Sequence, residues 1–199
     1  MAREEAVNSL RSRPQEPGPA TDLELLAKVR AGDRAAFEQL YRLYHPRLNR
    51  FLWTLMRRPT LVEEVLNDTM MVVWNRPDSF QGASKLSTWI FSIAYRKAMK
   101  GLRKQDEAIE DTEAERRVST DAAPDESSSR ARVRQLLTQA VAELSPAHRA
   151  VVDLTYFHEL GYRDIAVILE CPVDTVKTRM FHARRHLRKK LSGVLTDWI

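Results

Sequence analysis

The stretch YRDIAVILECPVDTVKTRMFHARRHLRKKL, residues 162–191, contains two helix-forming segments separated by a short break at CPVD, residues 171–174. Ala166 is small where the two helices would cross, and Asp174 is placed to cap the second one. Apolar residues then recur at helical spacing and predict one buried face; they are Val176, Met180, Ala183, Leu187 and Leu191. This combination of two helices and a tight break predicts a helix-turn-helix.

The other face of the second helix is polar and basic. It carries Lys177, Thr178, Phe181, His182, Arg184, Arg185, Arg188 and Lys189. A helix that is held by a buried stripe can read base edges in a major groove, while additional Arg and Lys side chains bind phosphates. The alternative is an ordinary amphipathic helix with a solvated basic side.

Composition limits the class of protein. The chain has 199 residues, 30% of them charged and 43% hydrophobic, which allows one ordinary domain or two small ones with a core. No apolar run is long enough for a membrane span, no signal-peptide core opens the chain, and Cys171 is the only cysteine. We therefore expect a cytoplasmic protein without membrane insertion, disulfides or a cysteine-based zinc site. Phosphate-binding glycine loops do not occur either.

Charge and polarity divide the chain into four parts. Residues 1–21 are rich in Pro and poor in large apolar residues, so we expect a flexible arm. Residues 22–104 carry a net charge of +7 and residues 131–199 a net charge of +4, and both have helical patterns. Between them, residues 105–130 are Ser-rich with a net charge of −6, which predicts a flexible acidic linker. The prediction is an all-α protein with two small helical domains, and its two basic blocks favour a nucleic-acid partner.

Capping residues predict where several of these helices begin. Asp22, Asp33 and Ser87 are candidate N-caps in the first domain, and Thr60 with Glu63 matches a capping box. In the second domain Ser145 precedes Pro146, which is suited to the first helical turn. Arg76-Pro77 should end the helix that Thr60 opens.

At this level of detail the chain resembles a known family. The segment LSPAHRAVVDLTYFHELGYRDIAVILECPVDTVKTRMFHARRHLRKKL resembles region four of the extracytoplasmic-function (ECF) sigma factors of bacterial RNA polymerase. AFEQLYRLYHPRLNRFL, VEEVLNDTMMVVW and FQGASKLSTWIFSIAYRKAMKGLRK resemble successive parts of sigma region two. The matches cover residues 22–104 and 131–191 in the family's order, which is more specific than a helix-turn-helix alone.

The resemblance implies a DNA-binding role for each domain. For the −35 element it implies a reading helix with Thr175, Lys177, Thr178, Arg179, Phe181, His182, Arg184 and Arg185. For recognition and melting of the −10 element it implies Gln81, Lys85, Ser87, Thr88, Tyr95, Arg96, Lys97 and Lys100. Opening a duplex requires a pocket, aromatic surface and phosphate-binding charge, which this second set supplies. Trp89 is an alternative aromatic reader, but its position also suits the core.

The resemblance also implies partners. Core RNA polymerase, with its β′ and β subunits, is the first. Its β′ subunit would bind exposed residues of the helix VEEVLNDTMMVVW, namely Glu63, Glu64, Asn67, Asp68 and Met71. A solvated acidic face near a helix N-terminus is the alternative for these residues. Promoter DNA and an anti-sigma factor complete the implied set. The family is not enzymatic, and neither a catalytic residue, a cofactor nor a metal is expected; His182 and His186 have metal-ligand spacing but no third ligand nearby.

Four residues depart from the family pattern. Arg96 and Lys100 replace the more usual Asn and Asp, which makes the −10 helix more basic. Glu170 and Asp174 stand where Gly is frequent, so Glu170 would occupy a left-handed turn at a cost of about 1 kcal/mol. The alternative function is a stand-alone helix-turn-helix regulator that binds DNA without polymerase, which has no reason to carry the region-two segments.

Overall fold

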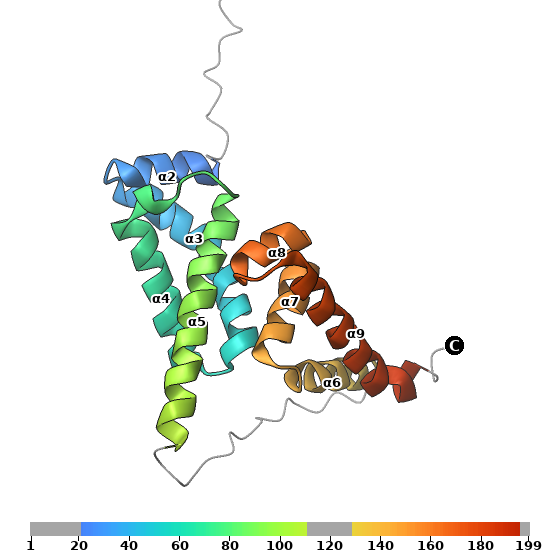
Figure 1. Cartoon of the computed structure of the whole chain (residues 1–199). Helices are drawn as coiled ribbons and strands as arrows, with labels where there is room; N and C mark the ends of the chain where they lie inside the picture. The colour runs from blue at the N-terminus through green and yellow to red at the C-terminus, as the bar shows by residue number, and fades with distance from the viewer. Residues whose placement is uncertain (1–20, 111–128, 196–199) are drawn as a thin grey trace, which may run out of the picture.

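In the computed structural model, residues 21–110 and 129–195 are described, and the described residues form helices and no strand. Figure 1 shows the two groups of helices. The first lobe contains α2 (Asp22–Arg30), α3 (Arg34–Met56), α4 (Pro59–Asn75), a 3₁₀ turn (Pro77–Ser79) and α5 (Leu86–Glu110). The second lobe contains α6 (Ser129–Ala142), α7 (Pro146–Tyr156), α8 (Tyr162–Ile168) and α9 (Val173–Leu195). The all-α prediction is confirmed, and none of the described helices is long and apolar enough to cross a membrane.

The beginning of α2 differs from the prediction by one residue. The cap is Thr21, whose hydroxyl accepts from the backbone N–H of Glu24, while the Glu24 carboxylate accepts from the Thr21 N–H. Asp22 is the first helical residue, and its carboxylate accepts a hydrogen bond from the Tyr44 hydroxyl at 2.7 Å. The prediction that Asp22 caps this helix is wrong because Thr21 and Glu24 form a reciprocal capping box.

Two further cap predictions in the first lobe have opposite outcomes. Asp33 caps α3 as predicted, since its carboxylate accepts from the N–H groups of Ala35 and Ala36. The capping box at Thr60 is wrong, because α4 begins one residue earlier at Pro59. Proline has no N–H to satisfy and a fixed φ, so it suits the first helical position without a side-chain cap.

The predicted and observed helix boundaries differ most at α5. The helix begins at Leu86, so Ser87 lies inside its first turn and is not the cap. It continues to Glu110, which places the first residues of the predicted linker, 105–110, in a helix. The rest of that linker, residues 111–128, and the predicted arm, residues 1–20, lie outside the described residues.

The helix-turn-helix prediction is confirmed in the second lobe, where α8 and α9 are separated by the short break. The preceding helix, α7, also begins as predicted, because Ser145 caps it with its hydroxyl and Pro146 follows at the first helical position. Glu170 has φ of 50°, so the non-glycine residue occupies the left-handed turn predicted for it. Asp174 is wrong as a cap, because α9 begins at Val173 and the backbone N–H groups of Thr175 and Val176 already bond to the carbonyl of Pro172.

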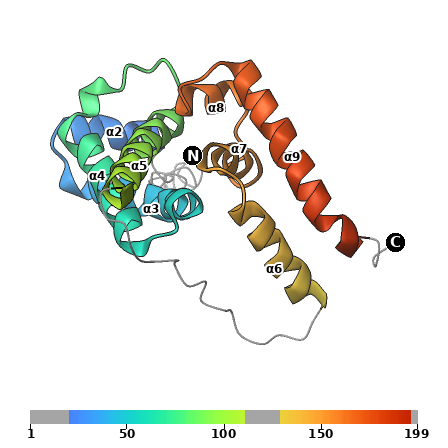
Figure 2. The ribbon, with the colours of Figure 1, turned by 60° about the horizontal axis from the view of Figure 1, so that its bottom comes forward.

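A single apolar core runs through both lobes. It contains Leu40, Leu48 and Leu66 from the first lobe, and Val176, Met180 and Ala183 from the stripe predicted for α9. Burial of each such large side chain contributes about 1.5–3 kcal/mol. The lobes meet where α7 packs on α3 and α8 packs on α5. Figure 2 shows α7 nearly end-on between the first lobe and α9, with α9 on the outer side.

Candidate nucleic-acid and polymerase interfaces

The outward face of α9 presents basic and aromatic side chains. Six of the predicted −35 residues are exposed on it, namely Lys177, Thr178, Phe181, His182, Arg184 and Arg185. The inward face is fixed because Val176, Met180 and Ala183 are buried in the core. The core contact therefore sets which side chains α9 offers to a partner.

A cavity of about 560 Å³ lies along this outward face. Its lining combines cationic and apolar side chains, from Tyr162, Lys177, Met180, Phe181, Arg184, Arg185 and Arg188. Phe181 is 62% exposed and presents its ring on this surface. The surface offers positive charge for phosphates and an apolar ring for base edges or thymine methyl groups.

Two of the predicted −35 residues are less exposed than the other six. Thr175 and Arg179 are half-buried. The Arg179 guanidinium donates to the Sγ of Cys171 at 3.7 Å, so it points toward the helix-turn-helix break. Arg179 therefore lies at the edge of the outward face rather than in its centre.

Tyr156, at the end of α7, was not predicted to belong to this surface. Its ring is 54% exposed, and its hydroxyl accepts a hydrogen bond from Nε of Arg184 at 3.0 Å. The Arg184 guanidinium also lies 5.8 Å from the ring centroid. Tyr156 thus orients one of the cationic side chains of α9, a contact between residues 28 positions apart that local sequence patterns do not indicate.

The predicted −10 residues lie on the loop before α5 and on its first turns. Gln81 and Lys85 are exposed, and Ser87 is half-buried. Thr88 is completely buried, and its hydroxyl donates to the Asp164 carboxylate of α8 at 3.3 Å. The Lys85 ammonium lies 3.3 Å from the same carboxylate. The structure therefore places Thr88 and Lys85 against the second lobe.

The next turns of α5 continue this contact. Tyr95 is only 9% exposed, and burial raises the pKa of its hydroxyl above the ordinary value. Arg96 is exposed and pairs with Glu170 at 3.4 Å, whereas Lys97 pairs with Asp68 of α4 at 2.9 Å. Lys100 is exposed beyond them. The predicted set thus lies on α5 and the loop before it, but its one aromatic side chain, Tyr95, is buried.

Trp89 adopts the core position that its sequence context allowed. Its ring packs at 5.5 Å from that of Phe80 and is half-buried against the apolar core. Phe91, two residues later, is completely buried. Neither of these α5 side chains is freely presented to a partner.

The outer face of α4 carries the predicted polymerase contacts. All five predicted side chains are exposed, namely Glu63, Glu64, Asn67, Asp68 and Met71. Asn67 accepts from the Tyr41 hydroxyl at 3.1 Å, so its orientation is fixed by α3. Met71 is 50% exposed beside these polar groups. An apolar anchor surrounded by acids and amides is a composition that suits a basic protein partner.

The junction between the lobes has a polar centre. His158, in the turn after α7, packs its ring edge-on against Phe51 of α3 and Phe91 of α5, with centroid distances of 6.2 and 4.7 Å. The buried Asp153 of α7 lies 3.2 Å from His158 Nε2 and accepts from Thr54 at 3.3 Å. Arg149 of α7 donates to the carbonyl of Leu55 at 2.8 Å.

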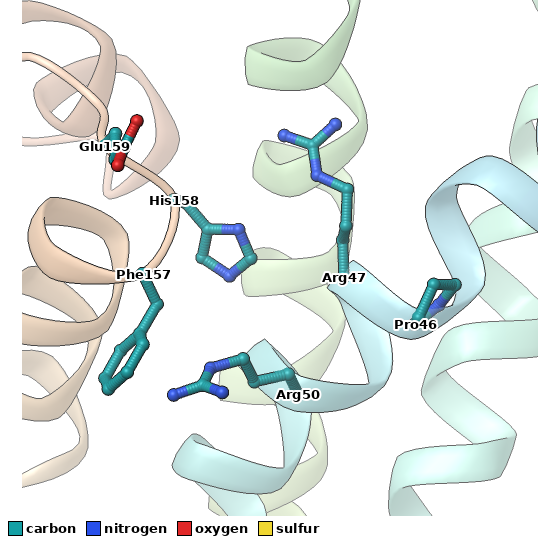
Figure 3. A pocket seen from close by; sticks show the side chains of 6 residues that line it. All are labelled: Pro46, Arg47, Arg50, Phe157, His158 and Glu159. Carbon is teal, nitrogen blue, oxygen red and sulfur yellow. The ribbon is translucent and has the colours of Figure 1, made fainter.

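Figure 3 shows the outer side of this junction, a cavity of about 290 Å³. Arg47 and Arg50 enter it from α3, and Phe157, His158 and Glu159 enter it from the turn after α7. The Arg50 guanidinium stacks 3.5 Å from the Phe157 ring centroid. This stacking and the Asp153 contact make Arg50 part of the connection between the lobes.

Comparison with known protein families identifies both lobes. Residues 40–108 match the model of sigma-70 region 2, and residues 134–187 match the model of sigma-70 region 4. The two matched segments occur in the order predicted from the motifs and together span more than half of the chain.

Individual relatives agree with this result over most of their length. The chain is 28% identical to the RNA polymerase sigma-H factor of Pseudomonas aeruginosa, over 88% of this chain and 96% of the relative. It is 29% identical to the ECF RNA polymerase sigma factor RpoE of Cereibacter sphaeroides, over 80% and 88%.

Two solved structures are similar in fold. A complex of the sigma factor RpoE with the anti-sigma factor NepR from Bartonella quintana matches with a TM-score of 0.64 and 26% identity, over 78% of this chain and 96% of that one. A complex of CnrH with the cytosolic domain of CnrY matches with a TM-score of 0.60 over 85% and 96%; at 24% identity it shows the fold alone.

Proposed function

Because this chain belongs to the ECF sigma factors of the sigma-70 family, we propose that it divides promoter recognition among three of its surfaces. As a family member it is not an enzyme, and it directs promoter recognition by RNA polymerase. The three surfaces are the outward face of α9, the loop and first turns of α5, and the outer face of α4.

The outward face of α9 is proposed to read the −35 element. The observation that carries this assignment is the exposed, cationic cavity around Phe181, backed by a buried stripe that fixes the rotation of α9. Lys177, Thr178 and Phe181 lie near the helix N-terminus, where base contacts are expected for a helix-turn-helix. Arg184, Arg185 and Arg188 would bind phosphates and set the register on the duplex.

The loop before α5 and the exposed cations of that helix are proposed to bind the −10 element and help open it. Gln81, Lys85, Arg96 and Lys100 are exposed and supply hydrogen bonding and charge. Thr88 and Tyr95 belong to the same surface once the second lobe moves away from it. With the helix ends as the structure has them, the two domains are proposed to extend over residues 22–110 and 129–199, with residues 111–128 connecting them.

The outer face of α4 is proposed to bind core RNA polymerase, including its β′ subunit. Its acids complement a basic partner, and Met71 supplies the apolar anchor. We further propose that the chain acts in the cytoplasm, where promoter DNA and polymerase are found, and that an anti-sigma factor regulates it. The last point is supported by the similar RpoE structure, which is a complex with the anti-sigma factor NepR.

Transcription with purified core polymerase and a genomic promoter library tests these assignments together. The wild-type chain should form a holoenzyme and enrich promoters with a shared pair of elements. Glu64→Lys should weaken holoenzyme formation, whereas Phe181→Ala should leave it intact and relax selection at the −35 element. Sequence-specific duplex binding without any polymerase binding would instead favour the stand-alone regulator.

A further inference from the structure

The last residue of α2 contacts the 3₁₀ turn that leads into the loop before α5, and α2 packs against this turn (Figure 1). The Arg30 guanidinium donates to the carbonyl of Phe80 at 2.8 Å and to that of Pro77 at 3.4 Å. Its Nε also lies 3.4 Å from the carboxylate of Asp78. Arg30 belongs to none of the three proposed surfaces, yet it holds the segment from which one of them begins.

Arginine is suited to this triple contact. Its guanidinium carries five N–H donors in a rigid planar arrangement, whereas the ammonium of lysine is a compact charge on a flexible stem. The Arg30 side chain is 40% exposed and that of Asp78 is 88% exposed, so water competes for the ion pair. The two carbonyl contacts should therefore contribute more to the position of the turn than the ion pair does.

The orientation of Gln81 depends on the position of this turn. Its Nε2 donates to the carbonyl of Asp78 at 2.8 Å. A carbonyl oxygen can only accept, so the amide nitrogen faces the turn and the amide oxygen is the end left for a partner. Gln81 is exposed and directly follows the Phe80 carbonyl that Arg30 holds. A shift of the turn would therefore move Gln81 and change which end of its amide it presents.

The other contacts of the turn are apolar. Pro77 is buried, and the buried Phe80 ring packs against that of Trp89 with centroids 5.5 Å apart. Apolar burial keeps the turn on the core, but it is non-directional. Gly82 follows with a φ of 73°, a left-handed conformation that glycine adopts without strain. Core packing thus places the turn, while the hydrogen bonds of Arg30 set the direction in which the loop leaves it.

We propose that Arg30 is a positioning residue for recognition of the −10 element. It acts through the turn at residues 77–80, which it fixes so that Gln81 meets an opened strand in one orientation. A loop that is ordered before binding loses less conformational freedom when it binds. Without Arg30 the loop should still reach DNA, but it should bind less well and discriminate less among bases. This role rests on the proposed −10 surface.

The first experiment measures promoter opening by holoenzyme that contains the full-length chain. A fluorescent base analogue in the −10 element reports opening, and binding to a −35 duplex is measured separately. Arg30→Met keeps an apolar stem but removes the guanidinium, so opening should slow about tenfold, as expected for lost hydrogen bonds to a charged group. Affinity for the −35 duplex should be unchanged. Lys28→Met is the matched control, because Lys28 is the other cation in the last turn of α2; it should change opening less than about twofold.

The second experiment measures base preference, which separates positioning from a general loss of folding. In selections by holoenzyme from a randomised −10 element, Arg30→Met should lower base preference because Gln81 no longer presents a fixed end. Arg30→Lys keeps the charge beside Asp78 and should give an intermediate result. Asp78→Asn removes only the exposed ion pair and should have a smaller effect than Arg30→Met. An unchanged opening rate in Arg30→Met, or slower opening with unchanged base preference, would overturn the proposal.

Variants of the loop distinguish failure of this inference from failure of the −10 assignment. If Gln81→Ala and Lys85→Ala alter neither opening nor base preference, the −10 assignment is wrong and the role of Arg30 falls with it. If Gln81→Ala relaxes base preference while Arg30→Met behaves as wild type, the −10 surface stands and positioning by Arg30 is overturned. The double variant Arg30→Met/Gln81→Ala should have the base preference of Gln81→Ala alone, because Arg30 acts through Gln81. A further loss in the double variant would contradict that route.

Discussion

Nε2 of His158 lies 3.2 Å from Oδ2 of Asp153 inside the lobe junction, and both side chains are almost completely buried. The two atoms are close, yet neither makes a well-aligned hydrogen bond to another described group. Asp153 still has Thr54 and the half-exposed Arg50 within reach of its other oxygen. Removing a partner from a buried carboxylate destabilises the fold, because its charge is then left uncompensated away from water.

Asp153→Asn should therefore destabilise the folded chain. The change preserves the shape of the side chain and the hydrogen bond from Thr54 but removes the negative charge that pairs with Arg50. We expect the free energy of unfolding to fall by about 1.5–3 kcal/mol, the range of hydrogen bonds to charged groups. Chemical denaturation of the full chain measures it.

The matched control is Glu143→Gln. Glu143 pairs with Lys190 and His186 inside the second lobe, and its carboxylate is about half exposed. Glu143→Gln should lower the free energy of unfolding less than Asp153→Asn does, because water competes for exposed ion pairs. Equal losses in the two variants would show that the burial of Asp153 carries no special weight.

His148 should make stability sensitive to mild acid. Burial, with smaller contributions from Arg179 and His182, lowers the pKa of its imidazole below the ordinary value. The unfolded chain therefore binds a proton at higher pH than the folded chain, so the free energy of unfolding falls as pH drops below about 6.5. His148→Asn removes this contribution, and its denaturation curves at pH 7 and pH 5 should differ less than those of wild type.

His45→Asn is the control variant, because His45 packs beside Tyr41 on α3 of the first lobe, whereas His148 belongs to α7 of the second lobe. If both variants keep the full wild-type dependence between pH 7 and pH 5, the low pKa of His148 does not contribute to it.

The helices and their inward faces could be predicted because they are set by local spacing. Asp33 and Ser145 were correct caps for the same reason, since each side chain needs only the next few N–H groups. Asp22 and Asp174 were wrong because a neighbouring residue already starts the helix, as Thr21 does by its capping box.

Contacts between the lobes could not be predicted from local patterns. Thr88 and Asp164 are 76 residues apart, and nothing near Thr88 indicates that its hydroxyl will be buried. Tyr95 seemed a good DNA-facing aromatic from its helix alone, but it is only 9% exposed, and Arg179 and Glu170 of the second lobe are near its hydroxyl. The exposed residues of α9 and α4 were easier, because each lies opposite a buried stripe on its own helix.

Two cations of α9 should differ in what they recognise. Lys177 is near the helix N-terminus, and its ammonium is held 2.9 Å from the Asp174 carboxylate at one end of the cavity. Lys177→Ala should cost about 1–3 kcal/mol on the preferred −35 duplex and relax base preference. Arg188→Ala should weaken all duplexes alike and reduce the salt dependence of log K by about one unit.

Duplex binding by the full chain at several salt concentrations, with a randomised −35 element, separates these effects. Unaltered base preference in the Lys177 variant would remove that residue from the reading set. A base-selective loss in the Arg188 variant would contradict its assignment to phosphate.

Met71 should be the most sensitive position for polymerase binding. Its side chain is half exposed on α4 beside Glu64, Asn67 and Asp68, so docking would bury it among groups that exclude water. Met71→Ala should weaken core polymerase binding about tenfold, equivalent to about 1.4 kcal/mol, with little change in melting temperature. Leu43→Ala is the control, since Leu43 is similarly exposed at 45% but lies on α3. Equal weakening by both variants would mean that the docking surface is not centred on α4.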